Sequence, residues 1–334
     1  MSKDKAPVAV LGAGSWGTAL AMLVARNGRP TYLWGHDAAQ MATMAHEREN
    51  SRYLPGLPFP AQLHVREDLA ELLSEVNRFL VVVPSHAFHG LITIMKPHLV
   101  TGTTLAWATK GLEPGTGRLL GDVVEDELAD SVSRAAVSGP TFAKEVAANL
   151  PTALTVAADN ETVAEEVADW LRSDRVRVYT SDDLSGVQLG GAIKNVIAVA
   201  AGISDGLGFG ANARAALITR GLAELTRLGV AMGGKVETFM GLTGTGDLVL
   251  TCTDDQSRNR RVGIGLGQGK KLPTILGELG QEAEGVATSK ELFHLAQSLD
   301  VDMPITEQVY RVIHENLSPQ QAVEALLSRD SKAE

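Results

Sequence analysis

Short apolar runs alternate with longer amphipathic stretches through the first half of the chain. This alternation predicts a parallel β-sheet covered by helices, because such strands are buried on both faces and each helix turns one apolar stripe toward them. We expect strands at residues 8–11, 31–34, 79–83, 103–106, 134–137 and 153–157. Ligands gather at the carboxyl ends of such strands. The residues at those ends are Gly12, His36, Pro84, Lys110 and 139–141.

The pattern changes near residue 185. From there the apolar spacing is almost wholly helical, with long stretches of Ala, Leu and Ile. We therefore predict an α/β domain at residues 1–184 and an all-helical domain at residues 185–334. The glycine-dense segment 263–269 is expected to be a loop.

Composition narrows the class of protein. A chain of 334 residues with 44% hydrophobic content can form two domains with cores of their own. The net charge of −10 argues against binding to nucleic acid or to an anionic membrane, so a local cationic site must capture any anion. A single cysteine, Cys252, excludes an internal disulfide framework, and no metal site is expected. Without a secretory h-region or a run of about 18 apolar residues, we expect a cytoplasmic protein with no stable membrane insertion.

A glycine motif follows the first predicted strand directly. Residues 12–17 read Gly-Ala-Gly-Ser-Trp-Gly and lead into an apolar helix expected at 18–26. Gly12 permits a tight turn, Gly14 lets the backbone approach a pyrophosphate, and Gly17 lets helix and strand pack closely. A plain turn would use the same residues, but this context favours dinucleotide binding. The predicted fold class is thus α/β, with an N-terminal Rossmann-type dinucleotide-binding domain and a C-terminal all-helical domain.

The end of the second predicted strand bears on the choice of cofactor. An acidic residue there usually holds the ribose 2′-hydroxyl of NAD, whereas a cationic group suits the 2′-phosphate of NADP. Here His36 comes first and Asp37 follows it. NADPH is therefore mildly favoured and NAD use stays open, with a surface role for His36 as the alternative.

One lysine stands in the small, apolar run 190–202, beside Asn195. Burying the Lys194 ammonium is costly unless it is paired or becomes neutral, so we predict that it serves chemistry. On a helix, Gly190 and Gly191 would leave a space beside it through which a small substrate could approach the amine. The alternative is a lysine whose head reaches the surface.

Two loops after predicted strands are candidates for substrate binding. Lys110 would lie at the mouth of the sheet, where its ammonium could meet an anion or a carbonyl oxygen, unless it is a solvated surface lysine. The segment 138–144 also follows a strand, and Gly139 and Thr141 could form a polar wall there. Capping of the next helix by Thr141 would explain that residue equally well.

The second half of the chain adds an anion site. Three arginines fall within residues 257–261, and their fork-shaped guanidinium groups match a phosphate. We expect Arg258 and Asn259 to face a ligand and Arg260 or Arg261 to face solvent or carboxylates, with a wholly solvated face as the alternative. Upstream, Asp247 ends a glycine-rich turn with Thr251 one helical turn later, so it could orient a lysine, receive a substrate hydroxyl or cap a helix.

In combination these motifs resemble the bacterial NAD(P)-dependent glycerol-3-phosphate dehydrogenases over nearly the whole chain. The matching segments are 10–20, 82–86, 107–113, 138–144, 191–195, 246–248 and 257–260. The resemblance implies a helical domain like that of 6-phosphogluconate dehydrogenase. It also implies reduction of dihydroxyacetone phosphate to sn-glycerol 3-phosphate for phospholipid synthesis, by a chain that could form a homodimer.

The same resemblance implies roles for individual residues. Lys194 would be the proton donor and acceptor, with its pKa expected below the ordinary value of about 10.4 because of desolvation. The implied substrate contacts are Lys110, Gly139, Thr141, Lys194, Asp247, Ser257, Arg258 and Asn259. The implied cofactor contacts, with the glycine motif, are Gly12, Gly14, Ser15, Trp16, Gly17, His36, Lys110, Ala143, Arg258, Glu282 and Glu284. Relatives usually have an aliphatic residue where Glu282 stands, so that contact is expected to use the backbone.

Two other functions fit parts of this pattern. A lysine-dependent dehydrogenase of small hydroxy acids could share the two-domain plan. A non-catalytic NADPH-sensing module could keep the cofactor fold, although such a sensor needs no proton donor beside a phosphate site.

Overall fold

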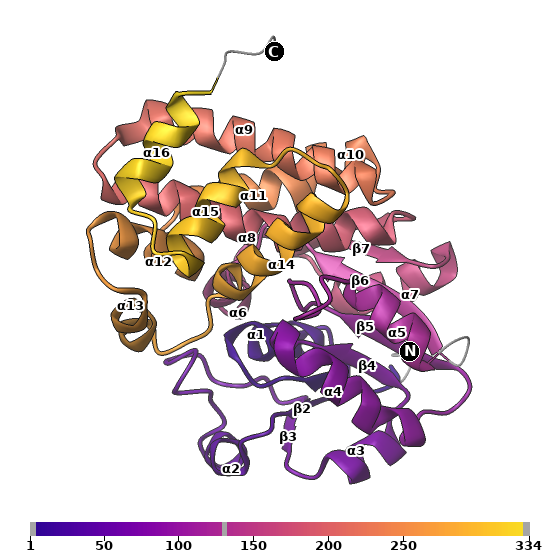
Figure 1. Cartoon of the computed structure of the whole chain (residues 1–334). Helices are drawn as coiled ribbons and strands as arrows, with labels where there is room; N and C mark the ends of the chain where they lie inside the picture. The colour runs from indigo at the N-terminus through magenta and orange to yellow at the C-terminus, as the bar shows by residue number, and fades with distance from the viewer. Residues whose placement is uncertain (1–4, 129–131, 330–334) are drawn as a thin grey trace. The chain divides into compact units, whose positions relative to one another are not determined.

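The chain forms two compact units in the computed structural model, which describes residues 5–128 and 132–329 (Figure 1). The first unit comprises Met1–Lys110 and Leu120–Gln188, and the second comprises Gly111–Leu119 and Leu189–Glu334. The expected division between residues 184 and 185 remains a prediction.

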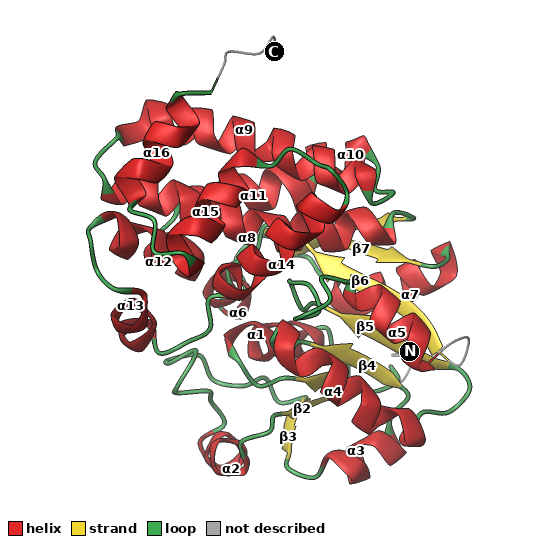
Figure 2. Ribbon diagram, in the orientation of Figure 1, coloured by secondary structure: helices red, strands yellow, loops and turns green. Residues whose placement is uncertain are grey.

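A single eight-stranded sheet organises the first unit (Figure 2). Its order is β3-β2-β1-β4-β5-β6-β7-β8. The strands are β1 (Val8–Leu11), β2 (Thr31–Trp34), β3 (Leu63–Arg66), β4 (Arg78–Val81), β5 (Thr103–Trp107), β6 (Val132–Ser138), β7 (Thr152–Ala158) and β8 (Val176–Ser181). All six predicted strands are present, with ends shifted by one or two residues at four of them.

The prediction of a parallel sheet was wrong at one pair, and two strands were missed. β7 runs antiparallel to β6 because the chain turns back after β6 through the short helix α6 (Ala143–Ala147). The missed strands are β3 and β8, which lie at the two edges of the sheet. Their exposed polar residues, such as His64 and Arg177, interrupt the apolar run that identifies a buried strand.

Alternate residues of the strands enter two separate cores, one on each face of the sheet. In β1, Val8 and Val10 pack with helix α1 (Ser15–Arg26), whereas Ala9 and Leu11 belong to the opposite core. The residues of α1 from 17 to 25 are all buried, which explains why its sequence has no polar face. The other helices of this unit are α2 (Ala38–Glu47), α3 (Leu69–Glu75), α4 (Ser85–Met95), η1 (Lys96–His98), α5 (Leu120–Leu128) and α7 (Glu161–Leu171).

Helices make up the second unit, as the sequence predicted. The longest, α8 (Leu184–Gly206), begins in the first unit and supplies the core of the second. It is long and apolar enough to cross a membrane, but 94% of its most apolar window is buried in the protein. The remaining elements are α9 (Gly210–Ala231), α10 (Val236–Met240), the π-helical turn η3 (Leu242–Gly246), α11 (Asp247–Thr253), α12 (Arg258–Gly267), α13 (Leu272–Leu279), α14 (Glu284–Ser298), α15 (Pro304–His314) and α16 (Pro319–Leu327).

The expected loop at 263–269 was wrong, because helix α12 continues to Gly267. Gly263 and Gly267 face α8 at a close crossing rather than forming a turn. A Cβ atom added at Gly263 would overlap the carbonyl oxygen of Val199, and one added at Gly206 would lie 2.5 Å from the carbonyl oxygen of Ile264. Glycine is therefore required here for contact between two helix backbones, which a local sequence pattern does not distinguish from a flexible loop.

Candidate active site

The glycine motif forms a turn between β1 and α1 that fits a dinucleotide. Gly12 has φ +126°, and a Cβ atom there would overlap the backbone of Val82, so the turn requires glycine. A Cβ atom at Gly17 would overlap the carbonyl oxygen of Gly12, which explains the close packing of helix on strand. By contrast, no atom lies within 4 Å of a Cβ built at Gly14. Gly14 also caps α1 without a side-chain hydrogen bond, leaving the amides of the first turn for an anion such as pyrophosphate.

The end of β2 presents His36 on the surface. Its side chain is exposed, whereas the carboxylate of Asp37 accepts a hydrogen bond from the backbone N–H of Gln40 and caps α2. The carboxylate thus has a local structural role, while the imidazole is accessible to a phosphate. The preference for NADPH over NADH therefore stays a prediction.

The loops after β5 and β6 bring four of the predicted residues together within the first unit. Lys110 is half-buried, and its Nζ atom donates a hydrogen bond to the carbonyl oxygen of Gly139 at 3.1 Å. The same atom lies 5.9 Å from the centre of the Trp16 ring, so Lys110 is held between the glycine motif and the β6 loop. Thr141 Oγ1 also donates to the carbonyl oxygen of Gly139, at 3.2 Å.

Two alternatives considered for these loops are excluded. Lys110 is not a solvated surface lysine, and Thr141 does not cap the next helix. The N-cap residue of α6 is Phe142, which makes no side-chain hydrogen bond there. Ala143, the first residue of α6, is partly buried against the core of the first unit.

Lys194 is buried in the second unit and paired with a carboxylate. Only 5% of the residue is exposed, and its Nζ atom lies 2.5 Å from Oδ1 of Asp247, which is fully buried. Nζ also donates to Thr251 Oγ1 at 2.9 Å, and the Thr251 hydroxyl in turn donates to the backbone carbonyl of Asp247 at 2.6 Å. The lysine head therefore does not reach the surface. Asp247 orients it and does not cap α11, whose N-cap residue is Gly246.

The space expected beside Lys194 at Gly190 is occupied by backbone. A Cβ atom at Gly190 would lie 2.6 Å from the carbonyl oxygen of Thr243 in η3. The prediction that Gly190 leaves an approach for substrate was therefore wrong. Gly190 lets η3 pack against α8. This packing places Asp247, the residue after η3, next to Lys194.

The side chains of the arginine cluster at residues 257–261 have different partners. Ser257 caps α12 by accepting from the N–H of Arg260 at 3.2 Å. Arg258 is half-buried, with Nη1 3.4 Å from Oε1 of Gln281. Arg260 is 8% exposed and pairs with Asp205 and Asp255, so a wholly solvated face is wrong for this residue.

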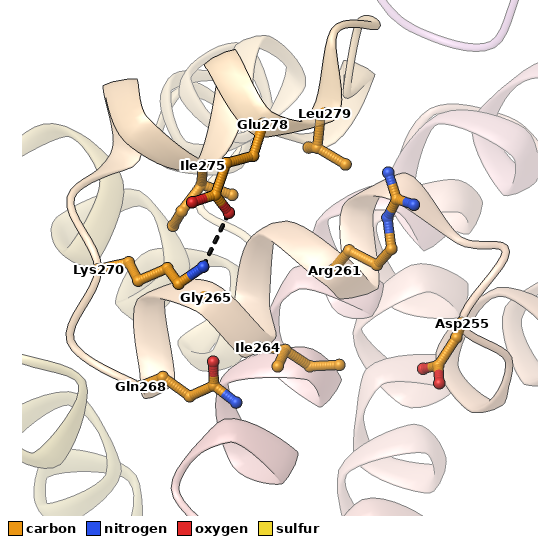
Figure 3. Close-up of a pocket in the computed structure, with 9 residues that line it drawn as sticks. All are labelled: Asp255, Arg261, Ile264, Gly265, Gln268, Lys270, Ile275, Glu278 and Leu279. Carbon is orange, nitrogen blue, oxygen red and sulfur yellow. Dashed lines mark hydrogen bonds and ion pairs between the residues drawn. The ribbon is translucent and has the colours of Figure 1, made fainter.

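Arg261 is exposed and borders a surface cavity of about 440 Å³ between α12 and α13 (Figure 3). Its lining mixes apolar side chains such as Ile275 with polar ones, among them the Lys270–Glu278 ion pair, which is 2.8 Å long. None of the predicted site residues lines it.

Two of the cofactor contacts predicted in the second unit, Glu282 and Glu284, lie between helices α13 and α14 or at the start of α14. Glu282 is exposed in the connecting loop, and Glu284 is the first residue of α14. Sequence reasoning did not assign a role to Asn195, which is 5% exposed and hydrogen-bonded to Asn259. The sequence feature that could have identified Asn195 is that it is a second polar residue, beside Lys194, in the apolar run 190–202.

The buried thiol of Cys252 does not belong to the chemistry. Burial raises the pKa of Cys252 to about 12 and outweighs the nearby Lys194 and Arg260 cations, which act to lower it. The residue remains a thiol at neutral pH and packs as a small apolar group.

Comparison with known proteins matches both halves of the chain to one family. The family models described as NAD-dependent glycerol-3-phosphate dehydrogenase N-terminus and C-terminus match residues 7–164 and 183–324. Enzymes named glycerol-3-phosphate dehydrogenase [NAD(P)+] from Mannheimia succiniciproducens and Pseudoalteromonas translucida are each 55% identical over 335 residues, covering 100% of both chains. The crystal structure of glycerol-3-phosphate dehydrogenase from Coxiella burnetii has a TM-score of 0.95 at 50% identity and covers 98% of this chain and 100% of that one.

Proposed function

Because the chain belongs to the NAD-dependent glycerol-3-phosphate dehydrogenase family, we propose that it interconverts dihydroxyacetone phosphate and sn-glycerol 3-phosphate. It is an NAD(P)-dependent oxidoreductase with a Rossmann-like domain and a helical domain. The direction that we propose is reduction of the ketone, supplying glycerol phosphate for phospholipid synthesis.

The observation that carries this proposal is the buried trio of Lys194, Asp247 and Thr251. Reduction of a ketone needs a proton at the carbonyl oxygen, and bound NAD(P)H supplies the hydride. The Lys194 ammonium can donate that proton to the forming alkoxide, because Asp247 and Thr251 hold its Nζ atom in one position. The Asp247 carboxylate stabilises the ammonium before transfer, and its low exposure keeps water from competing for the lysine.

The remaining residues bind and orient. Arg258, with Ser257 and Asn259 beside it, would hold the phosphate, which converts remote binding energy into alignment of the reacting carbon. Lys110, Gly139 and Thr141 would contact the other end of the substrate. The proposed cofactor contacts are Gly12, Gly14, Ser15, Trp16, Gly17, His36, Lys110, Ala143, Arg258, Glu282 and Glu284. A domain division at 184/185, a homodimer and a cytoplasmic location complete the proposal.

The test is oxidation of NADPH and NADH, followed at 340 nm with purified protein. Oxidation of NAD(P)H with dihydroxyacetone phosphate, but not with unphosphorylated dihydroxyacetone, is the expected result. Small hydroxy acids, which can only donate hydride, are tested in the other direction, and we expect no reduction of NAD(P)+ with them. Lys194→Ala should lose most of the turnover while NADPH binding stays nearly intact. Near-normal turnover in that variant would remove Lys194 from the proton transfer, and no oxidation by the wild type despite NADPH binding would overturn the proposed reaction.

A further inference from the structure

Three residues of the second unit form a chain of buried amide hydrogen bonds. Asn195 Nδ2 donates to the carbonyl oxygen of Gly191 at 3.3 Å, and Asn259 Nδ2 donates to Asn195 Oδ1 at 2.9 Å. Asn259 Oδ1 then accepts from the backbone N–H of Gly285 at 2.9 Å. These bonds connect α8, the first turn of α12 and the first turn of α14. We call Asn195, Asn259 and Gly285 the amide relay.

The backbone at both ends determines the orientation of the relay. The N–H of Gly285 can only donate, so it requires the oxygen of Asn259 to face it. The carbonyl of Gly191 can only accept, so it requires the Nδ2 atom of Asn195. Turning either side-chain amide over would set two donors or two acceptors against each other in a buried site, where an unmade hydrogen bond costs most.

This orientation leaves Asn259 with one remaining polar contact to make. Its oxygen accepts from Gly285, and one Nδ2 hydrogen is used by Asn195. No hydrogen bond of the second Nδ2 hydrogen is found in the described part of the chain. Asn259 directly follows Arg258 and is 8% exposed. Because the Asn259 oxygen already accepts from Gly285, the group that Asn259 offers to a ligand beside the Arg258 guanidinium is an N–H donor. A phosphate oxygen, which only accepts, suits that donor.

The other end of the relay sets the start of α14. A Cβ atom at Gly285 would lie 2.6 Å from the backbone oxygen of Asn195 and 2.9 Å from Asn259 Oδ1, so α14 begins directly against the relay. Glu284 immediately precedes Gly285, and Glu282 lies two residues earlier. A shift of the Asn259 amide therefore moves the segment that carries both of these proposed cofactor contacts.

We propose that the amide relay couples cofactor binding to phosphate binding, with Asn195 and Gly285 as positioning residues. The inference rests on the proposed function, since it assigns the phosphate to Arg258 and Asn259 and the cofactor to Glu282 and Glu284. A cofactor that orders residues 282–285 holds the Asn259 amide in its donating position, and a phosphate on that amide holds residues 282–285. Such coupling is reciprocal, so each ligand tightens the other by the same factor.

The test is a fluorescence titration of the intact protein with NADPH, with and without saturating sn-glycerol 3-phosphate. Both ligands are in their reduced forms, so no turnover occurs. For the wild type we expect sn-glycerol 3-phosphate to tighten NADPH binding by about fivefold or more. In Asn195→Ala, which removes the acceptor for Asn259, the factor should fall to within about twofold of one. Gly285→Ala should do the same, since the added methyl group displaces α14 from the relay.

Gly277→Ala is the matched control, because a Cβ atom there meets nothing within 4 Å and the glycine lies in α13. It should retain the coupling of the wild type. A wild-type factor of one, or unchanged coupling in both relay variants, would overturn the inference. Steady-state oxidation of NADPH with dihydroxyacetone phosphate separates the two hypotheses: if the wild type turns over normally without coupling, only the relay fails, and if it does not turn over, the proposed function fails.

Discussion

Removing either member of the Lys194–Asp247 pair should cost far more stability than removing both. At 2.5 Å between Nζ and Oδ1, and with an effective dielectric constant of about 20, the attraction is about 7 kcal/mol. Desolvation of two ions buried at 5% and 0% exposure offsets most of that attraction. Each single variant, Lys194→Met or Asp247→Leu, leaves one buried charge without its partner and should lose about 3–5 kcal/mol. The double variant removes both charges and should lie within about 2 kcal/mol of the wild type.

Urea unfolding of the four proteins at pH 7 measures the cycle. The expected coupling energy is at least about 3 kcal/mol, whereas independent sites add to within about 0.5 kcal/mol. Additive losses would refute the argument that the pair is an electrostatic unit. Turnover separates the chemical role from the structural one, since the double variant should be stable and still inactive. A stable, active double variant would show that neither residue takes part in proton transfer.

Three further predictions concern other parts of the chain. Burial raises the pKa of Glu224 to about 7, against opposing hydrogen bonds from the N-terminus of α15, while an ordinary glutamate has 4.5. Between pH 4.5 and pH 7, folding therefore takes up a proton at Glu224. The free energy of unfolding is highest below pH 4.5 and falls by about 3 kcal/mol as the pH rises through 7. Urea unfolding should show the wild type losing this amount relative to Glu224→Gln between pH 4.5 and 8, and a constant difference would contradict the assignment. Gly263→Ala should lose about 1–3 kcal/mol because its methyl group overlaps a carbonyl of α8, whereas Gly90→Ala, with open space around it, should lose none in the same assay. Gly14→Ala should weaken NADPH binding about tenfold or more with little change in Tm, while Gly17→Ala should lower Tm; equal effects on Tm would refute the different roles of these glycines.

Local sequence patterns predicted the elements in which consecutive residues lie in the same environment. The buried strands β1, β2, β4 and β5 read as apolar runs because both of their faces are covered. The glycine motif was legible because turn, backbone approach and helix packing all fall within six consecutive residues. Edge strands β3 and β8 were missed because half of their positions face away from the core, so their composition resembles that of a loop.

The glycines of α8 and α12 show the limit of such reasoning. A dense glycine segment predicts a loop from local propensity, because glycine loses the most entropy in a helix. Contact between two helix backbones outweighs that penalty here, but the contact joins residues such as Val199 and Gly263 that are far apart in the sequence. Helix α12 therefore extends through a segment whose own residues disfavour it.

For the site, the sequence by itself determined which chemical features were available. These are a glycine turn suited to a dinucleotide, a lysine in an apolar helix and an arginine cluster. It also indicated that a buried Lys194 must be paired or neutral, since an unpaired ammonium is expensive to bury. Only the tertiary structure decided that Asp247 and Thr251 supply that partner, that Gly190 admits η3 rather than substrate, and that Asn259 is oriented by Gly285. These outcomes depend on distances between segments more than 25 residues apart in the chain. Propensity and periodicity act over a few neighbouring residues, whereas the pairing of buried charges and amides is settled only when distant helices pack.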